Sequence, residues 1–415
     1  MTHASRLRTL AVLWVLTLTF LARRAAAQPI PGGGEKSPPV PVTGGFGRGY
    51  TLRAEDDSFL FNFRLRMQLQ GSGETKAENP SGGQGERPDI GFFVRRLRVV
   101  FQGHAVDKSL RYYVQLGFSP RDQESDLIVP VRDAQLIWTG VRDLNVRFGQ
   151  MKVPFNRERV ISSSALGMVD RSNVNAELNL DRDVGVMLQS RDLFGLGDVL
   201  RYNLGVFGGD GRNRSSPDTG MLYAARIEVA PFGAFDDYSE SDLRRSPAPR
   251  LSLGFASAYS ESTRRTRGTH GDTLKTGTLD YRHGAADLIF KIGGFSLQAE
   301  VLFRKSLQAS LSGTGPTGTP LIELPRNAWG TMVQAGFLVN DRWEISLRHG
   351  EIRPLGGGNG GLLRDREIGG ALSFYARGHD LKIQVDYFRL LTDADATGDV
   401  VFSRHRVRLQ TQLFF

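Results

Sequence analysis

Apolar and polar residues alternate along most of this chain, which is the pattern of β-strands that bury one face. The clearest stretch is residues 58–70, and fifteen further stretches repeat the pattern, the last at 401–415. In 58–70 the apolar side chains share one face: Phe59, Phe61, Phe63, Leu65, Met67 and Leu69. Sixteen strands of about ten residues predict an all-β chain folded as an antiparallel transmembrane β-barrel, because such barrels have an even number of strands and no unpaired edge.

The connections between these stretches alternate in length, as expected of long external loops and short periplasmic turns. Long connections such as 71–91 and 152–182 are followed by short ones such as 104–108 and 192–198. The connection 231–249 is the exception, because it is long where a short turn is expected. A soluble stack of sheets would have to hide the same strands and protect its edges, so the 16-stranded barrel is the preferred interpretation.

The N-terminal residues 1–27 are typical of a secretory signal peptide. A positively charged start and an apolar run from Leu10 to Ala22 precede small residues that offer a cleavage site near Ala27. The run is shorter than the roughly 20 residues of a membrane-spanning helix. We therefore expect export to the bacterial outer membrane, a Pro/Gly-rich periplasmic linker at 28–57, and a barrel at 58–415 in contact with outer-membrane lipid.

Composition argues against several kinds of chemistry. The chain has no cysteine, which excludes disulfides and thiolate ligands, and its seven His form no metal-spaced pair. The serine run 162–164 has no neighbouring His that could act as a base. Loss of residues 1–27, which hold four Arg and no acid, lowers the net charge from +9 to +5. Without a concentrated basic face a nucleic-acid partner is not expected, and we predict no catalytic residue, no metal and no cofactor.

Arginine recurs on the face that should line the lumen. Alternation places eight arginines there: Arg64, Arg66, Arg96, Arg98, Arg111, Arg147, Arg406 and Arg408. Because strand 401–415 should close the barrel against 58–70, all of them except Arg147 should form one continuous basic wall. Such a wall lowers the electrostatic cost of admitting anions, and guanidinium groups match carboxylate and phosphate oxygens. The hypothesis is a passive path for small anions.

The longest connection, 152–182, carries five cationic side chains among several acids: Lys152, Arg157, Arg159, Arg171 and Arg182. A loop of this length either hangs outside the barrel or folds inward, where mixed charges opposite a basic wall would narrow and filter the pore. Phe415 ends the last alternating strand. A terminal aromatic in this position is the signal that outer-membrane barrels present to the barrel assembly machinery.

Three stretches stand in order along the chain: FFVRRLRVVFQG at 92–103, RFGQMKVPFNRE at 147–158 and DRDVGV at 181–186. Together they resemble the family of phosphate-selective porins O and P. The resemblance implies a 16-stranded barrel, usually a homotrimer, whose third external loop folds into the lumen and whose arginine ladder guides anions to a constriction; the expected solutes are small anions of the phosphate or polyphosphate class. The phosphate-specific members add a lysine cluster, whereas lysine accounts for only 8 of the 53 basic residues here.

Two other interpretations stay open. A general, weakly selective porin is compatible with the acids predicted on the opposite wall, which include Glu300, Glu344 and Asp386. A closed outer-membrane barrel would instead act as an adhesin or structural protein through its long loops. The residues alone do not define the natural solute, the pore radius or the oligomeric state.

Overall fold

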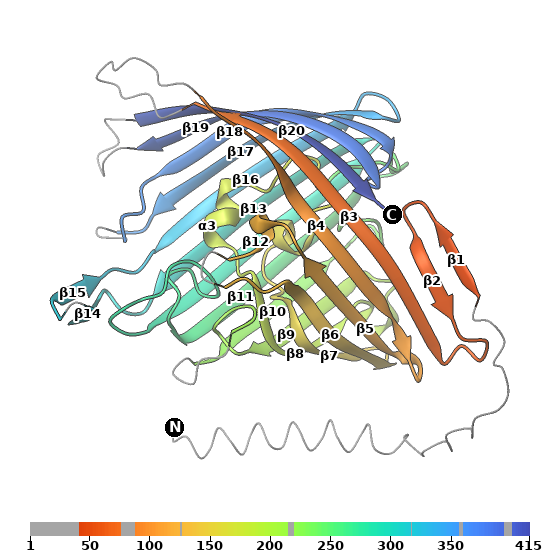
Figure 1. Cartoon of the computed structure of the whole chain (residues 1–415), viewed down its shortest axis with the longest axis horizontal. Coiled ribbons are helices and arrows are strands. Elements are labelled where there is room, and N and C mark those ends of the chain that lie inside the picture. Colours follow the sequence, from red (N-terminus) through yellow and green to blue (C-terminus); the bar gives the residue numbers. More distant parts are fainter. Residues whose placement is uncertain are drawn as a thin grey trace. The chain divides into compact units, whose positions relative to one another are not determined.

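The computed structural model describes residues 41–75, 88–124, 127–214, 220–316, 318–356, 360–393 and 401–415. All of them belong to one compact unit, Pro41–Phe415. Within it, sixteen antiparallel strands pair in sequence order, and the last strand pairs with the first, which closes the barrel (Figure 1). The predicted fold class is therefore confirmed. The predicted signal peptide and the start of the predicted linker lie outside the described residues.

The barrel strands have the following bounds: β3 (Phe59–Glu74), β4 (Asp89–Ala105), β5 (Asp107–Gly117), β6 (Val131–Val141), β7 (Leu144–Lys152), β8 (Arg182–Ser190), β9 (Leu200–Phe207), β10 (Leu222–Val229), β11 (Arg250–Thr263), β12 (Leu279–Ile292), β13 (Phe295–Ser306), β16 (Ala328–Leu338), β17 (Trp343–Pro354), β18 (Asp365–Arg377), β19 (Leu381–Asp393) and β20 (Val401–Phe414). The remaining elements are β1 (Val42–Gly45), β2 (Gly49–Arg53), β14 (Leu311–Thr314), β15 (Pro320–Glu323), the helices α2 (Arg157–Val160) and α3 (Asn173–Leu178), and the 3-10 helices η1 (Pro120–Asp122) and η2 (Leu193–Gly195). No helix among the described residues is both long and apolar enough to cross a bilayer.

The two faces of each strand differ in polarity, and the apolar face points outward. In β17, Leu347 is 65% exposed on the outside whereas its neighbour Arg348 is 3% exposed on the inside. This is the reverse of a soluble protein, in which apolar side chains are buried in the core. It is the arrangement expected when the outside contacts lipid and the inside contacts water and polar side chains.

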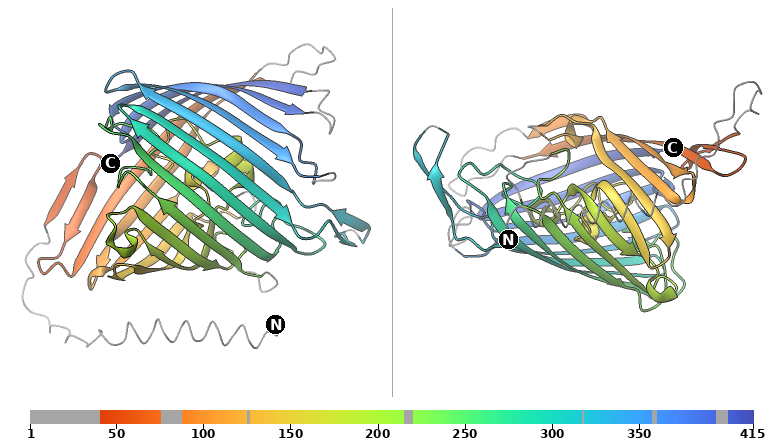
Figure 2. Two further views of the ribbon diagram at one scale, coloured as in Figure 1. Left: turned by 180° about the vertical axis from the view of Figure 1, so that it is seen from behind. Right: turned by 90° about the horizontal axis from the view of Figure 1, so that it is seen from below.

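The connection between β7 and β8, which we call loop 153–181, lies inside the ring of strands, where α3 is visible in two views (Figures 1 and 2). Phe155 and Leu178 are fully buried and pack in one cluster with Leu302 of β13 and Met332 of β16. Gly330 of β16 permits this approach, because a Cβ there would lie 3.0 Å from the side chain of Leu178. An apolar cluster inside the barrel therefore holds the loop against the wall of β13 and β16.

The long connection between β10 and β11, which we call turn 230–249, also enters the lumen. Its Glu240 donates a backbone hydrogen bond to the carbonyl of Ala165 (3.0 Å), and the Glu240 carboxylate accepts one from the backbone N–H of Gly167 (2.8 Å). The turn therefore meets loop 153–181 inside the barrel. This contact explains why the connection is long where the alternation of lengths predicts a short turn.

Part of the segment predicted as a linker is folded. Residues 42–53 form the β1–β2 hairpin, and β2 pairs with residues 60–63 of β3, whereas β20 pairs with residues 66–74 of the same strand edge. Phe415 exchanges two backbone hydrogen bonds with Leu65 between these regions. The assignment of 28–57 to a linker is thus corrected for 42–53, because the edge of β3 extends past the end of β20 and β2 pairs with it.

Candidate functional site

Two cavities lie in the lumen, the inner one lined mainly by β3 to β10 and the outer one by β3, β4, β6, β18 to β20 and the long loops. The outer vestibule, of about 790 Å³, is lined by residues near the long loops, and the inner cavity, of about 410 Å³, is lined by residues near the short turns. Four arginines line both cavities and form what we call the four-arginine junction: Arg98, Arg132, Arg159 and Arg171. A solute that moved between the cavities would contact these guanidinium groups.

The inner cavity is strongly cationic. Eleven cationic side chains line it: Arg66, Arg98, Arg132, Arg147, Lys152, Arg159, Arg171, Arg182, Arg191, Arg201 and Arg226. Two carboxylates line it, and both are already paired. Asp133 accepts two hydrogen bonds from Arg182, each of 3.0 Å, and Glu228 accepts from Arg226 at 2.8 Å. The lining therefore carries an excess of nine positive charges.

Several of these cations have no carboxylate partner among the described residues. Arg66 donates to the hydroxyl of Ser162 at 3.2 Å, while its Nε is buried without a hydrogen-bond partner, as is Nε of Arg147. Lys152 donates to the carbonyls of Val160 and Ile161 at 2.9 and 3.2 Å. Unsatisfied cationic donors in a buried site are costly, so these groups favour an anion in the cavity.

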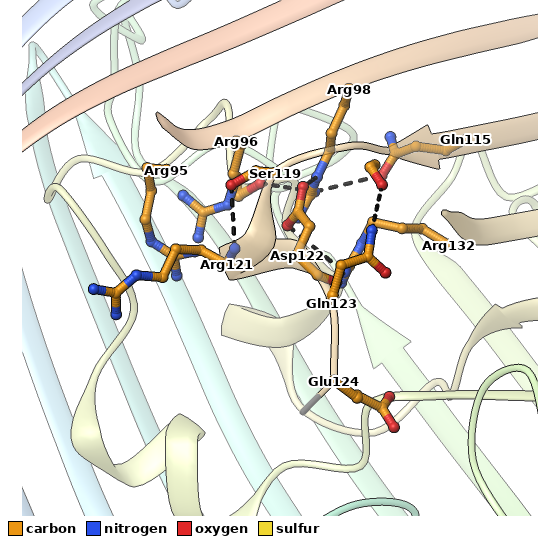
Figure 3. A network of polar contacts seen from close by, with 12 residues as sticks. Arg95, Arg96, Arg98, Gln115, Ser119, Arg121, Asp122, Gln123, Glu124 and Arg132 are labelled. Carbon is orange, nitrogen blue, oxygen red and sulfur yellow. Dashed lines mark hydrogen bonds and ion pairs between the residues drawn. The ribbon is translucent and has the colours of Figure 1, made fainter. Parts of the chain in front are cut away.

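Arg66 and Arg98 face each other directly across the β3–β4 pair. Like charges at opposed positions are destabilising unless another group compensates them. For Arg98 the compensating group is Asp122 of η1, which accepts hydrogen bonds of 2.8 and 2.5 Å, and Figure 3 shows the two side chains pointing toward one another. Burial raises the pKa of Asp122, but the Arg98 hydrogen bond and charge lower it more, so Asp122 stays ionised. Arg66 has no such partner.

A β-bulge in β4 turns two consecutive arginines inward. Gln68 pairs with Arg96 but Leu69 pairs with Val94, so Arg95 is an extra residue in the strand. Both arginines reach the carboxylate of Asp170 in loop 153–181, Arg95 at 2.6 Å and Arg96 at 2.9 Å. This fork ties the loop to β4. Strict alternation places Arg95 on the lipid face, which is why the sequence analysis missed it.

The eight arginines predicted to line the lumen divide between three places. Arg66, Arg98 and Arg147 line the inner cavity; Arg96, Arg98, Arg406 and Arg408 line the outer vestibule; Arg64 and Arg111 line neither cavity. The Arg64 guanidinium lies 3.8 Å from the ring centre of Phe414 and donates to the carbonyl of Gly47, and Arg111 is exposed. Arg408 is neutralised by Asp386 through two hydrogen bonds of 2.8 and 2.6 Å. Arg98 lines both cavities, so the inner and outer groups meet there, whereas Arg64 and Arg111 lie apart from them.

Arg157 occupies a different place from the other cations predicted for this loop. It is completely buried against the far wall, where it donates to Asp287 of β12 at 2.8 Å, Ser252 of β11 at 2.9 Å and Asp237 of turn 230–249 at 3.2 Å. The loop, the turn and two strands are thus joined by one guanidinium. Arg157 anchors the loop and does not line either cavity. Arg159, by contrast, lies at the four-arginine junction and pairs with Asp181.

Of the acids predicted on the far wall, Glu300 anchors the loop, whereas Glu344 accepts a hydrogen bond from Ser241 of turn 230–249 and Asp386 pairs with Arg408. Glu300 accepts hydrogen bonds from the side chain of Asn156 (2.9 Å) and from the backbone N–H of Glu158. Glu158 in turn accepts from the backbone and hydroxyl of Ser172, at 2.7 and 2.6 Å, just before α3. Burial raises the pKa of Glu158 to about 7. These carboxylates are engaged by loop 153–181, which leaves few free acids to oppose the cationic side.

Three further inward arginines were missed: Arg132 of β6, Arg201 of β9 and Arg226 of β10. Alternation along β9 and β10 places Arg201 and Arg226 inward. Arg132 is different, because it is an extra residue in β6: Gln115 pairs with Asp133 but Leu116 pairs with Val131, so Arg132 departs from the outward face that Leu136 occupies. The partners of these side chains lie far away in sequence, as in the 2.9 Å contact between Arg201 and Asp237. No sequence signal identifies such pairs.

Comparison with known proteins agrees with this geometry. The family model described as phosphate-selective porin O and P matches residues 61–415. An anion-selective porin from Comamonas acidovorans is 11% identical with a TM-score of 0.53, covering 86% of this chain and 100% of that one. The outer-membrane channel DcaP of Acinetobacter baumannii is 12% identical with a TM-score of 0.55, covering 88% and 99%. OmpT of Vibrio cholerae, in a trimer form, is 11% identical with a TM-score of 0.51, covering 86% and 100%.

At these identities the solved structures show a shared fold. No curated protein sequence matches the chain. The family match covers nearly the whole barrel and rests on sequence, and the neighbours are outer-membrane porins and channels. This chain is therefore a bacterial outer-membrane porin and belongs to the family of phosphate-selective porins O and P.

Proposed function

We propose that this porin admits small anions, of the phosphate class among others, by passive diffusion through the outer vestibule and the inner cavity. The observation that carries the proposal is the excess of nine positive charges in the lining of the inner cavity. Four carboxylates just outside the lining, Asp122, Asp181, Asp237 and Asp287, pair with some of these arginines, and the surroundings stay positive after they are counted. A narrow, water-filled path lined by one sign of charge attracts ions of the opposite sign and repels its own. Cations would therefore be disfavoured there.

The outer vestibule and the inner cavity would act at different stages. Twelve arginines and eight carboxylates line the vestibule, so its charges largely offset one another. It would collect solutes with weak preference, and selection would follow at the four-arginine junction. Beyond the junction, Arg66 and Arg147 present donors that an anion can use in place of water. Several weak sites in sequence allow an anion to bind and still leave.

Loop 153–181 supports the proposed route, because with turn 230–249 it occupies the opposite side of the lumen. Lys382 of β19 donates to the carbonyl of Leu166 at 2.6 Å and Ser373 of β18 to that of Gly167 at 3.0 Å. Gln334 of β16 donates to Glu240 at 2.8 Å. We propose that the loop is the constriction and that Arg159 and Arg171 are the residues through which it contacts the solute.

Phosphate selectivity itself is the finer part of the proposal. Guanidinium forks suit phosphate oxygens, and Lys152 is the one lysine that lines the inner cavity. The second candidate is a general porin with weak selectivity, which the mixed charges of the outer vestibule favour. The two candidates differ in whether phosphate binds inside the channel or merely passes.

Single-channel recording tests the proposal. The refolded protein would be inserted in a planar bilayer under a potassium chloride gradient, and phosphate would then be added. A reversal potential on the chloride side with block of the chloride current by phosphate is the expected result. Weak selectivity without block would favour the general porin. A current that prefers cations, or no current, would overturn the proposal, and no current would favour a closed barrel.

We also propose two partners, further copies of the chain in a homotrimer and the barrel assembly machinery. A homotrimer follows from the family and from the solved trimer form of the OmpT neighbour; chemical cross-linking in outer membranes would test it. Phe415 is proposed as the assembly signal because it ends β20 at the barrel seam. Deletion of Phe415 would then lower the amount of folded barrel in the membrane, measured by the heat-dependent shift in gel mobility.

A further inference from the structure

A pair of like charges also occurs on the outer surface of the barrel. Arg282 of β12 and Lys305 of β13 are directly opposed in register, and both side chains point outward and are exposed. Side chains at such positions are separated by only about 5 Å, and like charges there are destabilising. Neither side chain makes an ion pair or a hydrogen bond with any residue that the structure describes.

The nearby carboxylates make no direct ion pair with these two cations. Asp280, two residues before Arg282 on the same face, accepts hydrogen bonds from the backbone of Ser262 at 2.6 Å and from Gln308 at 2.9 Å. Glu261 at the end of β11 also has a partner of its own. Two adjacent cations are therefore left without a directly bound carboxylate in this region of the described surface.

Their depth places them at the edge of the bilayer. Lys305 lies ten residues beyond Phe295, the first residue of β13. At about 3.3 Å per residue and a strand tilt of about 40°, this corresponds to a height of about 25 Å, which is the height of the apolar band of such barrels. Tyr259 of β11 is directly opposite Arg282 on its other side, and Tyr is enriched at this interface. The pair therefore lies level with the headgroups on the side of the long loops.

We propose that Arg282 and Lys305 form a binding site for the phosphate groups of a lipid headgroup in the outer leaflet. Phosphate offers several oxygens to the fork of Arg282 and a counter-charge to Lys305. The acyl chains would lie along the apolar outer side chains of β13, which include Val301 at 49% and Phe303 at 36% exposure. A second copy of the chain fits less well, because Glu351, an outward acid of β17, is already bound to Arg353 and Arg364.

Lipid retention by the full-length protein tests this site. The purified protein and the double variant Arg282→Gln/Lys305→Gln would be incubated in detergent with diphosphoryl lipid A, and bound lipid measured by native mass spectrometry. The expected result is about thirtyfold weaker binding by the double variant, since each cation near an anionic lipid contributes a factor of about five. The matched control is Arg342→Gln, an exposed arginine in the turn between β16 and β17 at the opposite end of the barrel.

The possible results distinguish a lipid site from the alternatives. Equal lipid retention by the double variant and the wild type would overturn the proposal, as would an equal loss in Arg342→Gln, which would indicate a general effect of charge. Complete displacement of lipid A by excess inorganic phosphate would show a site for free anions in place of a lipid site. Loss of the oligomer in the double variant, measured by cross-linking, would show a subunit contact. Unchanged melting of the variant confirms that a loss of lipid is not a loss of fold.

Discussion

Replacement of Arg66 by Gln removes one positive charge from the inner cavity without breaking an ion pair. The Arg66 side chain is 3% exposed, its Nε has no hydrogen-bond partner, and its guanidinium donates to Ser162. Gln keeps a polar side chain without the charge, although it is two bonds shorter than Arg. Most other cations of the cavity bind a carboxylate, and their replacement would also leave that carboxylate unpaired. Replacement of Arg66 changes the charge of the cavity and leaves no carboxylate unpaired, so it tests the anion path directly.

The magnitude follows from Coulomb's law. An anion about 4 Å from the guanidinium gains about 1 kcal/mol at the dielectric constant of bulk water and about 4 kcal/mol at an effective value near 20. The lumen is wet, so we take the lower figure, which corresponds to about a fivefold fall in the permeability ratio of chloride to potassium. Salt screens the effect over about 10 Å at 0.1 M, so the decrease should be larger at lower ionic strength.

The stability of the same variant should not fall. Arg66 is directly opposite Arg98, and removal of one of two opposed like charges relieves repulsion. The relief offsets the loss of one hydrogen bond to Ser162, worth about 1 kcal/mol. We therefore expect an unchanged or raised melting temperature together with reduced anion preference, two effects that a general loss of structure would not combine.

Reversal potentials of single channels under a potassium chloride gradient measure the ratio, and thermal unfolding in detergent measures the stability. The matched control is Arg111→Gln, because Arg111 is exposed and lines neither cavity; its reversal potential should equal that of the wild type. An unchanged reversal potential in Arg66→Gln, or an equal change in both variants, would refute the role assigned to the inner cavity.

Three further predictions concern loop 153–181. Arg157→Met leaves buried carboxylates such as Asp287 with one counter-charge fewer, so it should lower the free energy of unfolding by about 3–5 kcal/mol. The loop should also loosen, which should increase the single-channel conductance. A variant with wild-type stability and wild-type conductance would contradict the anchoring role of Arg157. Asp170→Asn frees Arg95 and Arg96 from their shared carboxylate, so it should raise the chloride-to-potassium ratio; a lower ratio would contradict it. The pKa of Glu158 rises from 4.5 to about 7 by burial, so the folded loop binds a proton that the unfolded one has lost. The docked loop should therefore lose stability as pH rises from about 4.5 to 7, seen as more current fluctuation at pH 8 than at pH 5, and Glu158→Gln should reduce the difference.

The strands could be predicted because neighbouring residues face lipid and lumen in turn, and lipid favours apolar side chains whereas the lumen favours polar ones. The alternation of apolar and polar residues is therefore present in all sixteen strands, and it is sufficient to predict the fold class. The turn 230–249 was visible as an anomaly of length, but its position was not, because contacts such as that of Glu240 with Gly167 join segments far apart in sequence. The local sequence pattern does not predict such long-range contacts.

The site could be predicted only in part for the same reason. Alternation correctly directed Arg66, Arg98 and Arg147 into the lumen, but it failed at Arg95, where one extra residue in β4 shifts the pattern. Alternation also does not predict which arginines are neutralised by a carboxylate. That depends on carboxylates delivered by loops, such as Asp122, and a loop's path is set by the whole barrel around it.

The cationic lining of the inner cavity has a consequence for the identification of the natural solute. Crowded like charges make the empty barrel less stable than its contacts alone would allow, and an anion that settles among them relieves that repulsion. A ligand that binds the folded state alone stabilises it in proportion to the logarithm of its concentration over its dissociation constant. Melting temperatures of the barrel measured across a panel of anions would therefore rank candidate solutes by their affinity for the cavity, without any measurement of transport.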